Sequence, residues 1–181
     1  MPRNHASHQR RTKTAILIVG EGPTERAFLR HIRDEYISRD SDVAVTVGCG
    51  FGGSPKCIIE RAMRLRVNRE YGGCFVVLDE DRLAEVDDKL RKRMRTRPPI
   101  IILPVQPCIE GLFLAILNHN NFSQANATSD FCKREFERNY IPADRKTDHR
   151  AYPQHFPRVV LDSQRRNVAQ LDAILRAVNI V

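Results

Sequence analysis

The hydrophobic residues in the first part of the chain fall into four short runs, each bounded by glycine, proline or charged residues. The runs cover residues 14–19, 43–47, 74–78 and 100–105. They are rich in β-branched residues. They largely lack the alternation of polar and apolar residues that is typical of a strand with one solvent-exposed face. This pattern is typical of strands that are buried on both faces of a parallel sheet.

Between the runs, apolar residues recur every three or four positions, which is the spacing of a helix with one buried face. Such helices are expected to begin at Pro23 and Pro55, to cover residues 83–94, and to run through residues 109–116. Strands that alternate with helices favour parallel pairing. The pattern therefore predicts an α/β fold with a mostly parallel, Rossmann-like four-stranded sheet flanked by helices.

The rest of the chain is less clearly patterned. Residues 118–157 are polar, with one short helix expected near 131–140, and a last helix is expected at about 162–178. We divide the chain into three parts. These are a basic tail at 1–13 that is disordered until bound, an α/β core at 14–118, and a helical, loop-rich extension at 119–181 that packs on the core.

Acidic residues follow two of the four runs at the point where each run ends. Glu21 follows the first run, and Asp79 and Asp81 follow the third. Since the carboxyl ends of parallel strands line one edge of a sheet, we expect these three side chains to converge. Carboxylates this close in a semi-buried crevice need protons or cations to neutralise them. Mg²⁺, which takes oxygen ligands and also binds phosphates, is the expected cation.

Each acidic residue also has a purely structural interpretation. Asp79 and Asp81 are residues that cap helices, but one helix needs only one cap, so at least one of the pair is spare. Glu21 could be a plain helix-capping acid, but Glu25 already suits that role for the helix that begins at Pro23, and we interpret Glu25 as structural. Glu80 points away in the local alternation and is interpreted as a bystander.

The composition points to an acidic partner. The chain has 181 residues, with 30 Lys and Arg against 22 Asp and Glu, a net charge of +8. The positive charge is clumped in the first thirteen residues and again in residues 89–97, which hold Lys89, Arg91, Lys92, Arg93, Arg95 and Arg97. Each clump fits contact with phosphate and fits a solvated face equally well.

The five cysteines show no CxxC pair, so neither a zinc site nor a disulfide framework is expected. They are interpreted as small core residues in a reducing compartment. The basic amino-terminal segment has no apolar signal region after it, and nothing approaches the ~20 apolar residues of a membrane span. The expected location is the cytoplasm, away from membranes.

Three further features bear on phosphate binding. The glycine-rich segment 48–54 matches neither common nucleotide-binding motif and is interpreted as a close-packed turn, with a phosphate cradle as the alternative. Lys56 either reaches a phosphate or is merely exposed. Arg82 either contacts phosphate or is a local counter-charge for the aspartates.

The order of the acidic elements resembles the Toprim fold, which occurs in topoisomerases, bacterial primases, and OLD-family and related nucleases. The first strand is followed by Glu-Gly-x-Thr-Glu at 21–25, and a later strand by Asp-x-Asp at 79–81. The resemblance covers about residues 14–110. Residues 106–114 (Gln-Pro-Cys-Ile-Glu-Gly-Leu-Phe-Leu) are similar to a block of RloB-like Toprim proteins, which are associated with bacterial restriction and anti-phage loci. Gly111 and Phe113 depart from that block.

The resemblance implies a role for each matching position. Glu21 would be a metal ligand or general acid/base, Asp79 and Asp81 would be metal ligands, and Glu110 would be the additional acidic residue of Toprim nucleases. The implied metal is Mg²⁺ or Mn²⁺. Glu110 also falls in the first turn of an expected helix, where glutamate is common anyway.

These observations favour a Mg²⁺-dependent phosphodiesterase, an endonuclease in bacterial anti-phage defence. Arg82, the 89–97 run and the basic tail would contact the phosphate backbone of the nucleic acid. One alternative is a Toprim subunit that is inert alone and is activated or held by a partner such as an ATPase. Another is a hydrolase or transferase for a small phosphorylated molecule. The sequence leaves open DNA or RNA as substrate, and whether the chain forms a homo-oligomer.

Overall fold

The computed structural model describes residues 13–178. The tail expected at 1–13 lies, apart from Lys13, outside the described residues. The strands are β1 (Thr14–Gly20), β2 (Val43–Cys49), β3 (Gly73–Asp79) and β4 (Ile100–Val105). The α-helices are α1 (Pro23–Tyr36), α2 (Pro55–Arg66), α3 (Asp88–Met94), α4 (Ile109–Ile116), α5 (Ser129–Asn139), α6 (Arg158–Gln164) and α7 (Ala169–Ala177).

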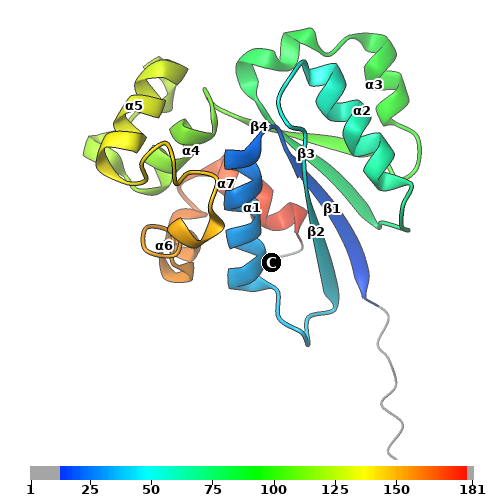
Figure 1. Ribbon diagram of the computed structural model, residues 1–181, viewed down its shortest axis with the longest axis horizontal. Helices are drawn as coiled ribbons and strands as arrows, with labels where there is room; N and C mark the ends of the chain where they lie inside the picture. Colours follow the sequence, from blue (N-terminus) through cyan, green and yellow to red (C-terminus); the bar gives the residue numbers. More distant parts are fainter. Residues whose placement is uncertain (1–12, 179–181) are drawn as a thin grey trace, which may run out of the picture.

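The four described strands form one sheet in the order β2-β1-β3-β4, and every neighbouring pair is parallel. This confirms the predicted α/β fold. β1 lies next to β3, with Gly20 in register with Val77, so the ends of the first and third hydrophobic runs are neighbours. All four strands point toward the same edge, above which α1 begins (Figure 1).

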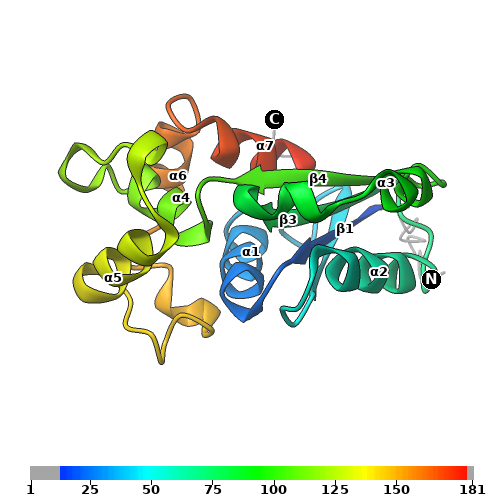
Figure 2. The same cartoon turned by 90° about the horizontal axis from the view of Figure 1, so that it is seen from above.

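Alternate residues of the strands pack against different helices. Ile18 and Val77 face a core shared with α1 and α7, whereas Leu17 and Val76 face α2 and α3. The two views in Figures 1 and 2 show α4, α5 and α6 grouped at one end of the molecule and α2 and α3 at the other. The sheet is therefore covered on both faces, as its hydrophobic runs require.

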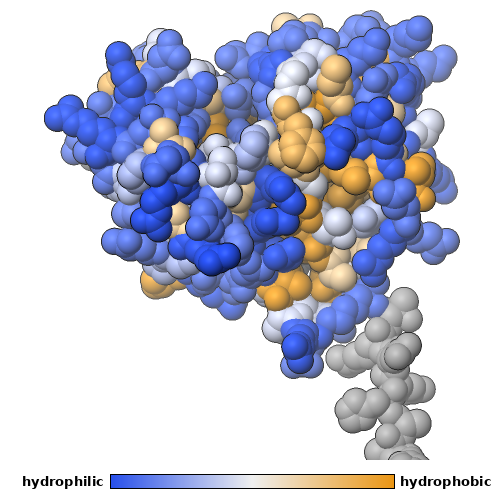
Figure 3. All heavy atoms as spheres, in the orientation of Figure 1, coloured by the Kyte–Doolittle hydropathy of each residue, from blue (hydrophilic) through white to orange (hydrophobic). Residues whose placement is uncertain are grey.

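β2 is a partly covered edge strand of the sheet. It lies at an edge, and its central residues Val45 and Val47 are only partly buried. Figure 3 shows apolar side chains exposed over this part of the molecule. The described residues contain no helix that combines the length and apolarity needed to cross a membrane.

The helix expected at 83–94 is wrong as a single element. A 3₁₀ turn, η1 (Glu80–Glu85), comes first, and α3 begins only at Asp88. Asp87 causes this restart because its carboxylate accepts a hydrogen bond of 2.6 Å from the Leu90 N–H and so caps a new helix. The apolar spacing survives the break, which is why periodicity did not reveal it.

The helix expected at about 162–178 is also two helices. α6 ends at Gln164, whose carbonyl accepts bonds from the Asn167 and Val168 N–H groups, and α7 begins at Ala169. The break redirects the chain so that α7 packs against β4. Arg165 then reaches Asp172 of α7 at 2.8 Å, which ties the two helices together.

The segment after α4 folds around a cluster of aromatic rings. Phe28 of α1 meets Phe113 of α4 with ring centroids 4.8 Å apart, and Tyr152 and Phe156 pack on both. Phe136 of α5 completes the cluster. All five side chains are fully buried. The remaining short 3₁₀ turns are η2 (His119–Asn121), η3 (Gln124–Asn126) and η4 (His149–Ala151).

Candidate functional site

Glu21 and Asp79 meet at the carboxyl edge of the sheet, although 58 residues separate them in the chain. Glu21 comes directly after β1, and Asp79 is the last residue of β3, the neighbouring strand. The Asp79 N–H donates to a carboxylate oxygen of Glu21 at 3.4 Å. The parallel pairing of β1 and β3 is thus what brings the two acidic elements together.

Asp79 is held in an environment that disfavours its charge. Its Oδ1 is buried and, among the described residues, accepts no hydrogen bond. The pKa of Asp79 is raised to about 8, first by burial and next by the negative charge of Glu21, with smaller contributions from Glu25, Cys108 and Asp81. Without a cation beside it, this carboxyl group holds a proton at neutral pH.

Arg82 supplies the positive charge at this edge. It lies in η1, directly after β3, and its guanidinium forms an ion pair with Glu21 and donates to the Gly53 carbonyl oxygen. Arg82 is thus a counter-charge for Glu21 rather than for an aspartate, and its contact with phosphate stays a prediction. The contact to Gly53 also ties the end of β3 to the loop between β2 and α2.

The aspartates do not cap α3. Asp79 precedes η1 without a capping hydrogen bond from its side chain, and Asp87 caps α3 instead. Asp81 lies in η1 and is exposed, as is Glu80. The structural interpretation of Asp79 and Asp81 as caps of the third helix is therefore wrong.

Glu25 is a member of the acidic group that sequence reasoning placed only in a structural role. Its carboxylate accepts a hydrogen bond of 2.8 Å from the Gly22 N–H, which is that structural role. Glu25 is also only 7% exposed because α1 approaches β1 closely; a Cβ at Gly20 would lie 2.6 Å from that of Glu25. Burial raises its pKa, and Glu110 and Glu21 raise it as well. The sequence feature that could have identified Glu25 as a member of this group is its position, four residues after Glu21 in the first turn of the following helix.

Glu110 is buried in a separate ion pair. It lies in the first turn of α4, and its Oε1 accepts from the Lys146 ammonium at 2.7 Å, while its Oε2 has no partner among the described residues. Lys146 also pairs with Glu137 of α5 at 2.6 Å. Glu25 is what connects Glu110 electrostatically to the strand-end acids. Lys146 comes from the poorly patterned segment, and no motif identified it.

The predicted phosphate-contacting residues lie on the surface of α2 and α3. Lys56 is exposed in the first turn of α2, and Lys89, Arg91, Lys92 and Arg93 are exposed on α3. Arg93 is already paired with Glu60 at 2.7 Å. In the glycine-rich loop, the Gly50 and Gly52 N–H groups donate to the carbonyls of Gly20 and Glu21, which favours the close-packed turn over a phosphate cradle.

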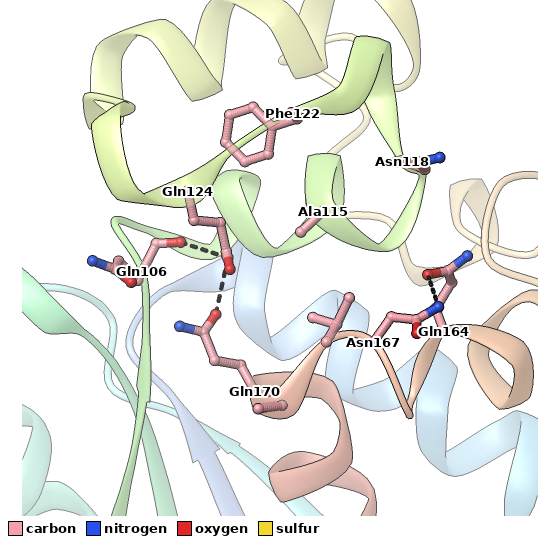
Figure 4. A pocket seen from close by; sticks show the side chains of 10 residues that line it. Gln106, Ala115, Asn118, Phe122, Gln124, Gln164, Asn167 and Gln170 are labelled. Atoms are coloured by element: carbon pink, nitrogen blue, oxygen red, sulfur yellow. Dashed lines mark hydrogen bonds between the residues drawn. The ribbon is translucent and has the colours of Figure 1, made fainter.

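A cavity of about 610 Å³ lies beyond the end of β4, and Figure 4 shows its lining. Gln124 donates to the Gln106 carbonyl at 2.8 Å and to Gln170 at 3.0 Å, and Gln164 and Asn167 lie together across the hollow. The described lining residues are carboxamide, aromatic and aliphatic. This cavity offers hydrogen bonds but no acid or base, so acid–base chemistry belongs to the strand-end group.

Within residues 13–178, no three acidic, histidine or cysteine side chains are arranged to hold a metal ion together. In this conformation Arg82 balances the charge of Glu21. No family model matches the chain, and comparisons with curated proteins and with solved structures found no significant match.

Proposed function

We propose that the chain is a divalent-metal-dependent phosphodiesterase that cleaves nucleic acid. The observation that carries the proposal is the buried, unpartnered Oδ1 of Asp79 beside Glu21, at the meeting point of two parallel strand ends. Hard divalent cations bind carboxylate oxygens, and their positive charge would offset the repulsion between neighbouring carboxylates. A buried carboxyl group with an unpartnered oxygen beside Glu21, and with Asp81 two residues along the chain, supports such a cation.

Glu21, Asp79 and Asp81 are the residues that would hold the cation, and Arg82 would first leave Glu21. When bound, such an ion lowers the pKa of water and neutralises charge on a phosphodiester. Once released from Glu21, the Arg82 side chain, which extends from η1, could bind a phosphate oxygen of the substrate. Glu110 is not needed as a ligand, because Lys146 already neutralises it.

The polymer substrate is supported by charge and by the Toprim resemblance. The exposed basic side chains of α3 follow directly on the η1 turn that carries Asp81 and Arg82. A chain with net charge +8 attracts a polyanion over long range. The same resemblance supports a place in bacterial anti-phage defence.

The test is cleavage of labelled single-stranded DNA, double-stranded DNA and RNA in Mg²⁺, Mn²⁺ or EDTA. Asp79→Asn keeps the shape of the side chain and should abolish metal-dependent cleavage. Glu80→Gln is the matched control, because this neighbouring exposed acid is outside the proposed site. Equal activity of the wild type and Asp79→Asn would refute the assignment.

A second candidate function is favoured by the contacts of Arg82. Because Arg82 holds both Glu21 and the Gly53 carbonyl, the chain would be inert until a partner draws Arg82 away. Such a partner would be another subunit of the system, for example an ATPase. Purified chain that binds Mn²⁺ but cleaves nothing, and that gains activity on adding the co-purifying partner, would select this candidate.

A further inference from the structure

Phe51 has a backbone conformation that phenylalanine rarely adopts. Its φ is 63°, in the left-handed region, and the next residues, Gly52 and Gly53, also have positive φ values of 72° and 91°. Glycine takes this conformation without steric cost, but a residue with a bulky side chain is strained in it. The sequence nevertheless places a large aromatic residue at the first of the three positions.

Burial does not compensate for this strain. The Phe51 side chain is 63% exposed, which is unusual for phenylalanine. Burial in the core therefore gives no reason for an aromatic ring here, and glycine would suit the backbone better. A strained, exposed side chain of this kind is a signal of function rather than of stability.

The ring contacts Arg61, and its loop is hydrogen-bonded to the backbone beside Glu21. The Arg61 guanidinium of α2 lies over the ring, 4.5 Å from its centroid. Gly50 and Gly52, on either side of Phe51, donate to the carbonyls of Gly20 and Glu21 at 2.8 and 3.0 Å. Figure 1 shows this β2–α2 loop at the carboxyl edge of the sheet. The loop thus attaches Phe51 to the backbone of the candidate catalytic strand.

We infer that Phe51, backed by Arg61, is a stacking platform for an unpaired nucleobase next to the acidic site. The inference rests on the proposed function and narrows its substrate to single-stranded nucleic acid, since bases in a duplex are already stacked on one another. Exposed aromatic rings with arginine beside them bind unpaired bases of any sequence. Lys56 is a further exposed cation of the same helix as Arg61.

The experiment compares two ligands of equal charge in EDTA: a 12-nucleotide single-stranded DNA and a 12-residue abasic strand. The wild type should bind the DNA more tightly than the abasic strand. Phe51→Gly should weaken DNA binding by about 5- to 100-fold and leave abasic binding unchanged. Because glycine suits φ 63°, this variant should unfold at the same or a higher temperature, which excludes misfolding as the cause. Val67→Ala, at the exposed end of α2, is the control.

Phe51→Trp gives a direct readout, because the chain contains no other tryptophan. Its fluorescence should be quenched by the DNA and not by the abasic strand. If Phe51→Gly binds the DNA as tightly as the wild type, or if both ligands quench equally, the platform is overturned while the phosphodiesterase proposal stands. If the wild type binds neither ligand, the nucleic-acid substrate itself is wrong.

Discussion

The Lys146 ammonium lies 2.7 Å from the Glu110 carboxylate, although 36 residues separate the two in the chain. Both side chains are almost withdrawn from water, with 11% and 3% of their surfaces exposed. Glu137 is the other carboxylate on Lys146. One buried ammonium thus forms ion pairs with two carboxylates and joins α4, α5 and the segment before η4.

Removing that cation should be costly. Lys146→Met leaves Glu110 buried without its partner, and we expect it to lower the free energy of unfolding by about 3–5 kcal/mol. Urea denaturation at pH 7 measures this loss. Adding Glu110→Gln to the variant should restore part of the stability; a double variant no more stable than Lys146→Met would show that the lost packing of the lysine stem is the cause.

Asp79 should make the protein less stable as the pH rises. The pKa of its carboxyl is about 8 in the folded chain against 3.8 for the ordinary group, so between these values the folded state holds a proton that the unfolded state has lost. The contribution of this carboxyl to the free energy of unfolding is fully present below about pH 4. It falls by up to about 1.4 kcal/mol per pH unit as the pH rises toward 8. Asp79→Asn removes this dependence.

The measurement is urea denaturation of both proteins at pH 5 and pH 8. Asp79→Asn should be the more stable protein, by a margin that is larger at pH 8. The difference between the two proteins isolates Asp79 from Glu25, whose pKa is also raised by burial. An equal margin at both pH values would contradict the buried, protonated state.

Arg82 should compete with a divalent cation for Glu21. Arg82→Gln removes the positive charge from the site, so we expect Mn²⁺ to bind several-fold more tightly in a calorimetric titration. The same variant should cleave nucleic acid at least about tenfold more slowly, because it lacks the proposed phosphate contact. Lys89→Gln removes an equal charge from exposed α3 and should leave Mn²⁺ affinity unchanged.

The basic face of α3 should determine how nucleic-acid affinity depends on salt. If Lys89, Arg91 and Lys92 each contact a phosphate, replacing all three by glutamine should reduce the slope of log affinity against log salt by about 2–3. Arg93→Gln should have a smaller effect, since Arg93 is already paired with Glu60. A slope that is the same in the triple variant and the wild type would place the polymer elsewhere.

The sequence predicted the sheet because its signals are local. Each buried strand is a continuous apolar run, and caps such as Ser54 mark helix starts; its side chain accepts from the Cys57 N–H as expected for a cap. The proximity of Glu21 and Asp79 followed from the general geometry of parallel strands. No relative was needed for either conclusion.

The contacts that sequence patterns missed are long-range and specific. Lys146 and Glu110, or Phe28 and Tyr152, are brought together by the path of irregular segments, which have no period. The break between α6 and α7 preserves helical spacing across residues 161–175 and so is invisible to a periodicity test. The platform at Phe51 depends on a positive φ angle. A glycine-rich segment predicts such angles for its glycines but not for a phenylalanine between them.

The aromatic cluster joins residues that are far apart in the chain, so its parts are translated at different times. Phe28 and Phe113 leave the ribosome well before Tyr152 and Phe156, the rings that cover them. A nascent chain that has reached residue 120 already carries Glu21, Asp79 and Glu110 but lacks Tyr152 and Phe156, which pack on Phe28 of α1, and Lys146, which pairs with Glu110. Of the acidic residues, Glu110 is therefore the one that is translated early and acquires its ion-pair partner late, after Lys146 has emerged.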